Sequence, residues 1–114
     1  MNSVLEIDKE SIQDILSRTK QLAEDYFARQ HELPPGRFIP DIPLESLPEK
    51  GIGANAVLDY FEKNFADKIA NSAGPRYFGF VTGGSTPAAV AGDWLVSTYD
   101  QNACGSNDSI APQL

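Results

Sequence analysis

The sequence predicts a mainly α-helical fold, with three helices joined by a proline-rich extended strap and a short strand-like piece. Three observations lead to this prediction. Apolar residues recur every three or four positions in two separate stretches, which is the period of an amphipathic helix. A third stretch opens with residues that start helices. Between the first two stretches, prolines and glycines are too frequent for a regular element to persist.

The first helix is expected over residues 9 to 30, with Asp8 as its N-cap. Its apolar residues share one face and its charged residues occupy the other, so we interpret the apolar face as packing surface. The apolar positions are Ile12, Ile15, Leu16, Thr19, Leu22, Ala23, Tyr26 and Phe27.

Residues 32–53 make up the proline-rich strap, with five prolines and three glycines. Proline lacks a backbone donor and favours extended geometry in its predecessor, so we expect neither helix nor strand here. The apolar residues between the prolines predict that the strap lies against a protein surface. A structureless run of about 20 residues is unusual inside a compact domain, which leaves open whose surface it covers.

A second helix is expected from Ala54 to Ile69, because its apolar residues again share one face. The stretch 76–81 is expected to be strand-like, ending before Gly83 and Gly84. The third helix should begin with Thr86 as N-cap and Pro87 at its first position. Its first half is slim and its second half is bulky, with Trp94, Leu95 and Tyr99.

Composition limits both the architecture and the classes of function. A chain of 114 residues forms one domain at most, and its 41% apolar and 22% charged residues are typical of globular proteins. Because these helices have few mutual partners, we expect a thin core and interpret residues 1–114 as an arm that packs on more protein.

The net charge of −7 argues against binding nucleic acid or an anionic membrane. The chain has no apolar run of about 18 residues and no signal peptide at its start, so neither a membrane span nor secretion is predicted. Its one cysteine, Cys104, fits a reducing compartment, and we expect a cytoplasmic protein.

No metal site is predicted, because His31 is the only histidine and Cys104 the only cysteine. The same scarcity argues against a serine, histidine and aspartate triad and against an activated thiol. The glycine-rich stretch 82–87 precedes a helix, where backbone amides can bind an anion. Its spacing matches no phosphate-binding motif, so capping and a tight turn are enough to explain these residues.

The most specific string in the chain is Pro75-Arg-Tyr-Phe-Gly-Phe-Val-Thr-Gly-Gly-Ser-Thr-Pro-Ala-Ala89, continued by Asp93-Trp-Leu95 and Asp100-Gln-Asn102. It resembles the N-terminal signature of pyridoxal-phosphate-dependent group II amino-acid decarboxylases, the aromatic-amino-acid and glutamate decarboxylase group. The resemblance covers residues 50–114 well and 9–45 in pattern. Gly74 stands where this family usually has histidine, and Tyr77 where it has phenylalanine.

The resemblance implies that the chain is the N-terminal arm of a fold-type-I, aminotransferase-like homodimer, in which such helices wrap around the neighbouring subunit. It implies that Phe80, Val81 and Thr82 lie near the substrate in the pocket wall. It also implies that Asn102 approaches the partner's site. Thr82 has an alternative interpretation as a turn residue before two glycines.

The family's chemistry uses pyridoxal 5′-phosphate as electron sink for loss of the α-carboxylate from an amino acid. It needs a lysine that forms a Schiff base, which the family carries far downstream in its large domain. None of the five lysines of this chain has that sequence context; they are Lys9, Lys20, Lys50, Lys63 and Lys68. The resemblance therefore implies a chain truncated at Leu114 that lacks the large domain, holds no catalytic or cofactor-binding residue and is inactive alone.

Two other hypotheses remain open. The chain could be a non-enzymatic remnant that forms a helical dimer or binds a separately encoded catalytic large domain. It could also be a small anion-binding module at residues 83–86, although the charge of −7 argues against this. None of these hypotheses identifies the substrate amino acid.

Overall fold

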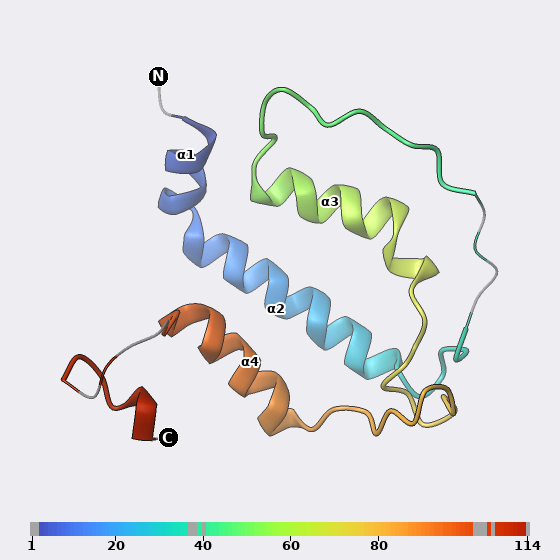
Figure 1. The fold of residues 1–114 in the computed structure, drawn as a ribbon. Coiled ribbons are helices and arrows are strands. Elements are labelled where there is room, and N and C mark those ends of the chain that lie inside the picture. The colour runs from blue at the N-terminus through green and yellow to red at the C-terminus, as the bar shows by residue number, and fades with distance from the viewer. Residues whose placement is uncertain (1–2, 37–38, 40, 102–104, 106, 114) are drawn as a thin grey trace. The chain divides into compact units, whose positions relative to one another are not determined.

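The computed structural model describes residues 3–36, 39, 41–101, 105 and 107–113 (Figure 1). These residues form four α-helices and two short 3-10 helices: α1 (Val4–Glu10), α2 (Ile12–Arg29), α3 (Ala54–Asn64), η1 (Ala66–Lys68), α4 (Pro87–Tyr99) and η2 (Ala111–Gln113). The chain divides into two compact units, Met1–Thr82 and Gly83–Leu114, and each is described by itself.

The mainly α-helical class is confirmed, but the strand-like piece predicted at 76–81 is wrong. The structure shows turns there and no strand anywhere in the residues that it describes. Phe80 and Val81 have φ of 54° and 57°, in the left-handed region that no strand adopts. Aromatic and β-branched residues favour strands only where a neighbouring strand can pair with them, and this segment has none.

The first helix begins earlier than predicted, and Asp8 is not its N-cap. α1 begins after Ser3, whose Oγ accepts a hydrogen bond from the Glu6 N–H at 3.2 Å. The Glu6 carboxylate accepts one from the Ser3 N–H at 2.7 Å, which completes a capping box. Ser11, with φ −97° and ψ 11°, interrupts the helix and separates α1 from α2.

Asp8 fastens α1 to the start of α3. Both oxygens of its carboxylate accept from the Ala54 N–H, at 3.0 and 3.1 Å. A carboxylate is stabilising at a helix N-terminus, where unpaired N–H groups carry a partial positive charge. Gly53 brings the chain into α3 with φ +87°, a conformation that favours glycine.

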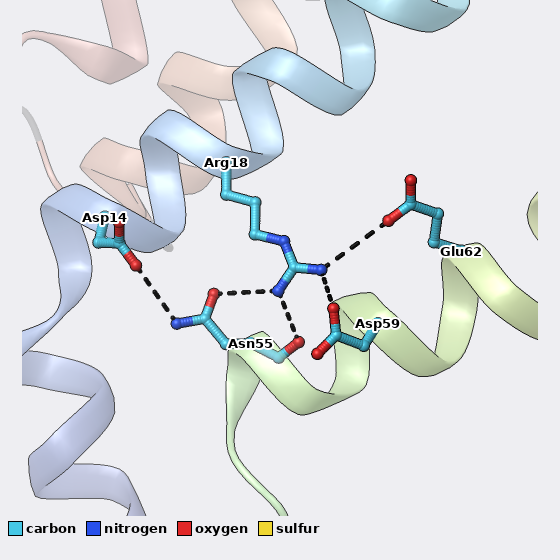
Figure 2. Close-up of polar contacts among 5 residues, drawn as sticks. All are labelled: Asp14, Arg18, Asn55, Asp59 and Glu62. Carbon is cyan, nitrogen blue, oxygen red and sulfur yellow. Dashed lines mark hydrogen bonds and ion pairs between the residues drawn. The ribbon is translucent and has the colours of Figure 1, made fainter.

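Arg18 of α2 joins α2 to α3 through a group of polar contacts (Figure 2). Its Nη1 donates to the backbone oxygen of Asn55 at 2.9 Å, and its Nη2 donates to the Asp59 carboxylate. Glu62, one turn further along α3, lies 3.9 Å from the same Nη2. The Asn55 side chain also donates to Asp14 of α2 at 3.5 Å. One guanidinium thus links the facing sides of two helices.

α3 ends at Asn64, five residues before the predicted end at Ile69. Phe65 leaves the helical conformation with φ −128°, and η1 follows. The Lys68 ammonium donates to the Asn64 backbone oxygen at 2.8 Å, so it pairs with one of the carbonyl groups that the helix end leaves free. The apolar period continues past this end, which is why the sequence predicted a longer helix.

Asn71 is the only buried side chain among the described residues, at 3% exposure. Its Oδ1 accepts from the Tyr26 hydroxyl at 2.7 Å. Its Nδ2 donates to the Gln30 backbone oxygen at 2.7 Å and is 3.4 Å from that of Leu33. Its own N–H donates to the Pro35 backbone oxygen at 3.1 Å. Asn71 therefore holds the C-terminal end of α2 and the start of the strap to the segment that follows η1.

No apolar side chain is buried in the part of the chain that the structure describes. The strap has no helix or strand in its described residues, as predicted, and its Leu44 and Leu47 are almost fully exposed. α2 and α3 also keep exposed apolar residues, such as Leu16 and Phe61. Ile15, Leu22, Leu58 and Phe65 are half-buried, so the core of the first unit is thin, as expected, and polar contacts add to it.

The second unit begins its helix as the sequence predicted. The Thr86 Oγ accepts from the Ala89 N–H at 3.2 Å, and Pro87 occupies the first turn. α4 ends where Asp100 turns left-handed, with φ 46°. Asp93 is the only charged residue of α4, and Trp94 and Leu95 are exposed. A helix that is apolar on all sides is normally buried, so α4 lacks a covering surface.

None of the helices within the described ranges is both long enough and apolar enough to cross a lipid bilayer.

Replacing Asn71 by aspartate should destabilise the first unit. The change turns a donor that faces two backbone oxygens into an acceptor, so we expect the free energy of unfolding to fall by about 1–3 kcal/mol. Urea unfolding followed by circular dichroism measures the loss. Asn107→Asp, in an exposed turn of the second unit, is the matched control and should change the value by less than about 0.5 kcal/mol. Equal effects of both changes would contradict the assignment.

Replacing Arg18 by alanine should loosen the contact between α2 and α3. We expect a loss of about 1–2 kcal/mol in unfolding free energy, because the guanidinium makes several bonds but its carboxylate partners are solvent-exposed. Arg18→Lys should recover less than half of that loss, since an ammonium group cannot reproduce the planar fork. Arg29→Ala is the control, because the Arg29 side chain donates to the Asp25 backbone oxygen of its own helix. Thermal unfolding of the three variants compares them.

Candidate functional site

The segment that carries the family resemblance begins at Pro75, and Arg76 holds its start to the turn that follows α2. Arg76 donates through Nη2 to the backbone oxygens of Glu32 and Leu33, at 3.1 and 2.9 Å. Those oxygens belong to the turn that follows α2, three and four residues after its last residue, Arg29. Arg76 therefore has a structural role, which is to fix the start of the candidate site to this turn.

Gly74, where the sequence departs from the family's usual histidine, lies against Asn71. A Cβ at position 74 would come within 2.6 Å of the Asn71 Cγ and closer still to its Nδ2. The Gly74 N–H also donates to the Asn71 backbone oxygen at 3.0 Å, which closes a turn. Any larger residue at 74 would displace the Asn71 amide from its partners, so the glycine and the buried asparagine depend on each other.

Tyr77 folds over Gly79 in the next turn. A Cβ on Gly79 would be 2.8 Å from the Tyr77 hydroxyl oxygen, so a larger residue there would push the end of the tyrosine aside. Phe78, between them, is 92% exposed and contacts no other ring closely. This turn buries its tyrosine partly and leaves its phenylalanine to the solvent.

Three predicted pocket residues, Phe80, Val81 and Thr82, follow consecutively. Phe80 is 92% exposed and Val81 fully so, and both have left-handed backbones. The Thr82 N–H and hydroxyl both point to the Gly79 backbone oxygen, at 3.4 and 3.3 Å. Thr82 thus makes the bonds of a turn residue, as its alternative interpretation expected. The left-handed conformation is unfavourable for a bulky or β-branched residue, by about 1–2 kcal/mol each.

The fourth predicted site residue, Asn102, lies outside the described residues, and so does Cys104. The division between the two units falls directly after Thr82. The structure therefore brings Phe80, Val81 and Thr82 together in one turn at the end of the first unit.

The described residues do not fit a pyridoxal-phosphate site. Lys9, Lys20, Lys50 and Lys63 are exposed, whereas a lysine that forms a Schiff base needs a desolvated setting to be reactive. Lys68 is half-buried, but its ammonium is bound by the Asn64 backbone oxygen and by Asp67. No group of three metal-ligating side chains occurs in the described ranges.

The strap is tied to α3 at one place. The Tyr60 hydroxyl donates to the Glu45 carboxylate at 3.0 Å. This bond to Glu45 is the main cause that raises the pKa of Tyr60 above 10.0, and desolvation and the charge of Glu45 add to it. A raised pKa means that the bond is fully present below the unfolded-state value and is lost as pH rises through the folded-state value. The tie is therefore intact at neutral pH.

Three residues that organise the first unit were not identified as such from the sequence: Asn71, Arg18 and Asp8. Each acts through a partner that lies 37 to 46 positions away in the chain. Asn71 stands just before the string that carries the resemblance, which begins at Pro75, and no local pattern marks it. Arg18 was indistinguishable from the other charged residues on the polar face of its helix.

Comparisons of the chain with protein-family models, with curated proteins and with solved structures found no match.

Replacing Val81 by glycine should leave stability unchanged or raise it by up to about 1 kcal/mol. Glycine adopts a left-handed φ without strain, and the exposed valine loses no contact. Val57→Gly, within α3, is the control and should cost about 1 kcal/mol or more. Chemical unfolding of both variants tests this prediction. A destabilised Val81→Gly variant would show that the valine side chain packs against something.

Proposed function

We propose that this chain is the N-terminal arm of a pyridoxal-phosphate-dependent amino-acid decarboxylase, a carboxy-lyase, and that it clasps subunits and supplies part of the substrate pocket wall. The observation that carries the proposal is the string Pro75–Ala89 with its continuations at 93–95 and 100–102. A run of this length, with aromatic, glycine and capping positions in order, is far more specific than a short glycine motif.

The distribution of apolar surface supports a role as an arm. A stable domain of this length normally buries a hydrophobic core, yet the described residues bury no apolar side chain. Apolar residues stay exposed along α2 and α3, in the strap and all around α4. Large exposed apolar surfaces mark places where another protein packs. The missing partner is, in this proposal, the rest of the enzyme.

The exposed turn at 78–82 supports a role in the pocket wall. Phe80 and Val81 present apolar side chains that nothing in their own unit covers. Strained, exposed apolar residues are typical of sites that contact a ligand or partner. In the intact enzyme they would line the space for the substrate side chain, while Thr82 holds the turn through Gly79. Asn102 would approach the site of the neighbouring subunit.

Catalysis is assigned to the large domain and not to this chain. The cofactor supplies the electron sink for decarboxylation, and a lysine of the large domain would hold it. The five lysines of this chain are exposed or already bound, so the chain alone should be inactive.

The proposal is tested by size-exclusion chromatography with light scattering on the purified chain, with pyridoxal phosphate added and its absorbance followed across the column. We expect a dimer or larger species that elutes free of the cofactor. A folded monomer that retains the cofactor through a lysine would contradict the proposal. Mutating each lysine in turn to methionine would then identify the residue responsible.

A second candidate function is a non-enzymatic remnant that dimerises or binds a separately encoded catalytic chain. The polar contacts of Arg18, Asp8 and Asn71 favour it, because they organise the first unit without a large domain. Sequencing the gene beyond codon 114 separates the two. A large domain in frame, or one shifted out of frame, supports the decarboxylase arm, and an unrelated sequence supports the remnant.

A further inference from the structure

We propose that the strap contains a proteolytic cleavage site. An endoprotease with an apolar specificity pocket hydrolyses the peptide bond between Leu44 and Glu45 while the chain is folded, and the two products stay paired. Water adds across this bond, so that Leu44 gains a carboxylate and Glu45 a free ammonium group. The substrate is the chain itself, and the site stands whether or not the chain is a decarboxylase arm.

The backbone of the strap can enter a protease without giving up any bond of its own. Residues 41–52 are exposed and lie in neither helix nor strand. No backbone N–H or C=O group of this segment makes a hydrogen bond to another described residue. Exposed segments with an unbound backbone are where folded chains are cut, because a protease must bind the backbone in an extended form.

Leu44 selects the bond within this segment. Its side chain is fully exposed, so the hydrophobic slot of a chymotrypsin-type protease can bind it without unfolding the chain. Leu47 is 92% exposed, but Pro48 follows it, and the proline ring on the leaving nitrogen obstructs such enzymes. The bond after Leu44 is therefore the one that an apolar pocket reaches.

Other exposed side chains of the first unit are less suitable. The bonds that follow Phe78 and Phe80 enter a turn in which Phe80 and Val81 have a left-handed backbone, and this turn must open before it can lie extended in a protease. Lys50 would suit a protease with an acidic pocket. However, the chain bends there, and Gly53, with φ +87°, already leads into α3.

The contacts that hold the first unit together survive the cut. Asp8, Arg18 and Asn71 each bond a residue on the other side of it, so these contacts link the two fragments. The bond between Tyr60 and Glu45 lies within the second fragment. Hydrolysis therefore breaks none of these bonds. It removes only the tether, so pairing of the fragments becomes dependent on concentration.

The site is tested by treating the full chain with a small amount of chymotrypsin and identifying the products over time by mass spectrometry. We expect the first products to be residues 1–44 and 45–114. Leu44→Ala should slow the first cut by about tenfold or more, because a methyl group fills the apolar slot poorly. Leu47→Ala is the matched control and should leave the rate unchanged. A first cut after Leu47, Phe78 or Phe80, or equal rates for both variants, overturns the proposal.

Pairing is tested by inhibiting the protease and passing the cut chain over a size-exclusion column. We expect the two fragments to elute together and to keep the helical circular dichroism signal of the intact chain. Asn71→Asp should make the cut fragments elute apart, because it removes bonds that join them. Arg29→Ala should not, since Arg29 bonds a residue of its own fragment. Unmodified fragments that separate, or that pair equally well with Asn71→Asp, overturn the pairing.

Discussion

The buried amide of Asn71 is the constraint on which the first unit depends. When an amide is removed from water, its donors and its acceptor must find hydrogen-bond partners. Otherwise the free energy of desolvating them is not offset, and the fold is less stable. Tyr26, the last residues of α2 and the start of the strap supply those partners. The path of the chain after η1 is set by this requirement, and so is the glycine at position 74, which leaves the amide the space it occupies.

Polar contacts join the helices of this unit, and no apolar side chain in its described residues is fully buried. Arg18 links α2 to α3, and Asp8 links α1 to α3. Contacts of this kind are directional, so they fix which helix lies beside which, but exposed ion pairs add little free energy. Apolar burial normally supplies most of the stability of a domain. A unit that has directional polar contacts but little apolar burial has a defined arrangement of helices and a low stability. A segment that another polypeptide completes would have these properties.

Sequence patterns predicted those features of the fold that depend on residues close together in the chain. The start of α4 follows from Thr86 and Pro87 alone, and the apolar period located α2 and α3. The start of α1 also depends on neighbouring residues, the capping box of Ser3 and Glu6, but the predicted N-cap was Asp8. The turn at 76–81 was mistaken for a strand because its aromatic residues favour strands when a partner exists. Contacts of Asn71, Arg18 and Asp8 span distant parts of the chain, and no local pattern contains them.

The string that resembles a decarboxylase signature divides into two kinds of residue. The fold explains one kind: Arg76 bonds the turn that follows α2, Gly79 lies under the Tyr77 ring, and Thr86 caps the start of α4. The fold does not explain Phe78, Phe80 or Val81, which are exposed, and two of which have unfavourable backbones. Selection for stability alone would favour polar or glycine residues at such positions. Neither burial nor a bond within the first unit explains these residues, and a substrate or a partner surface should be sought beside them.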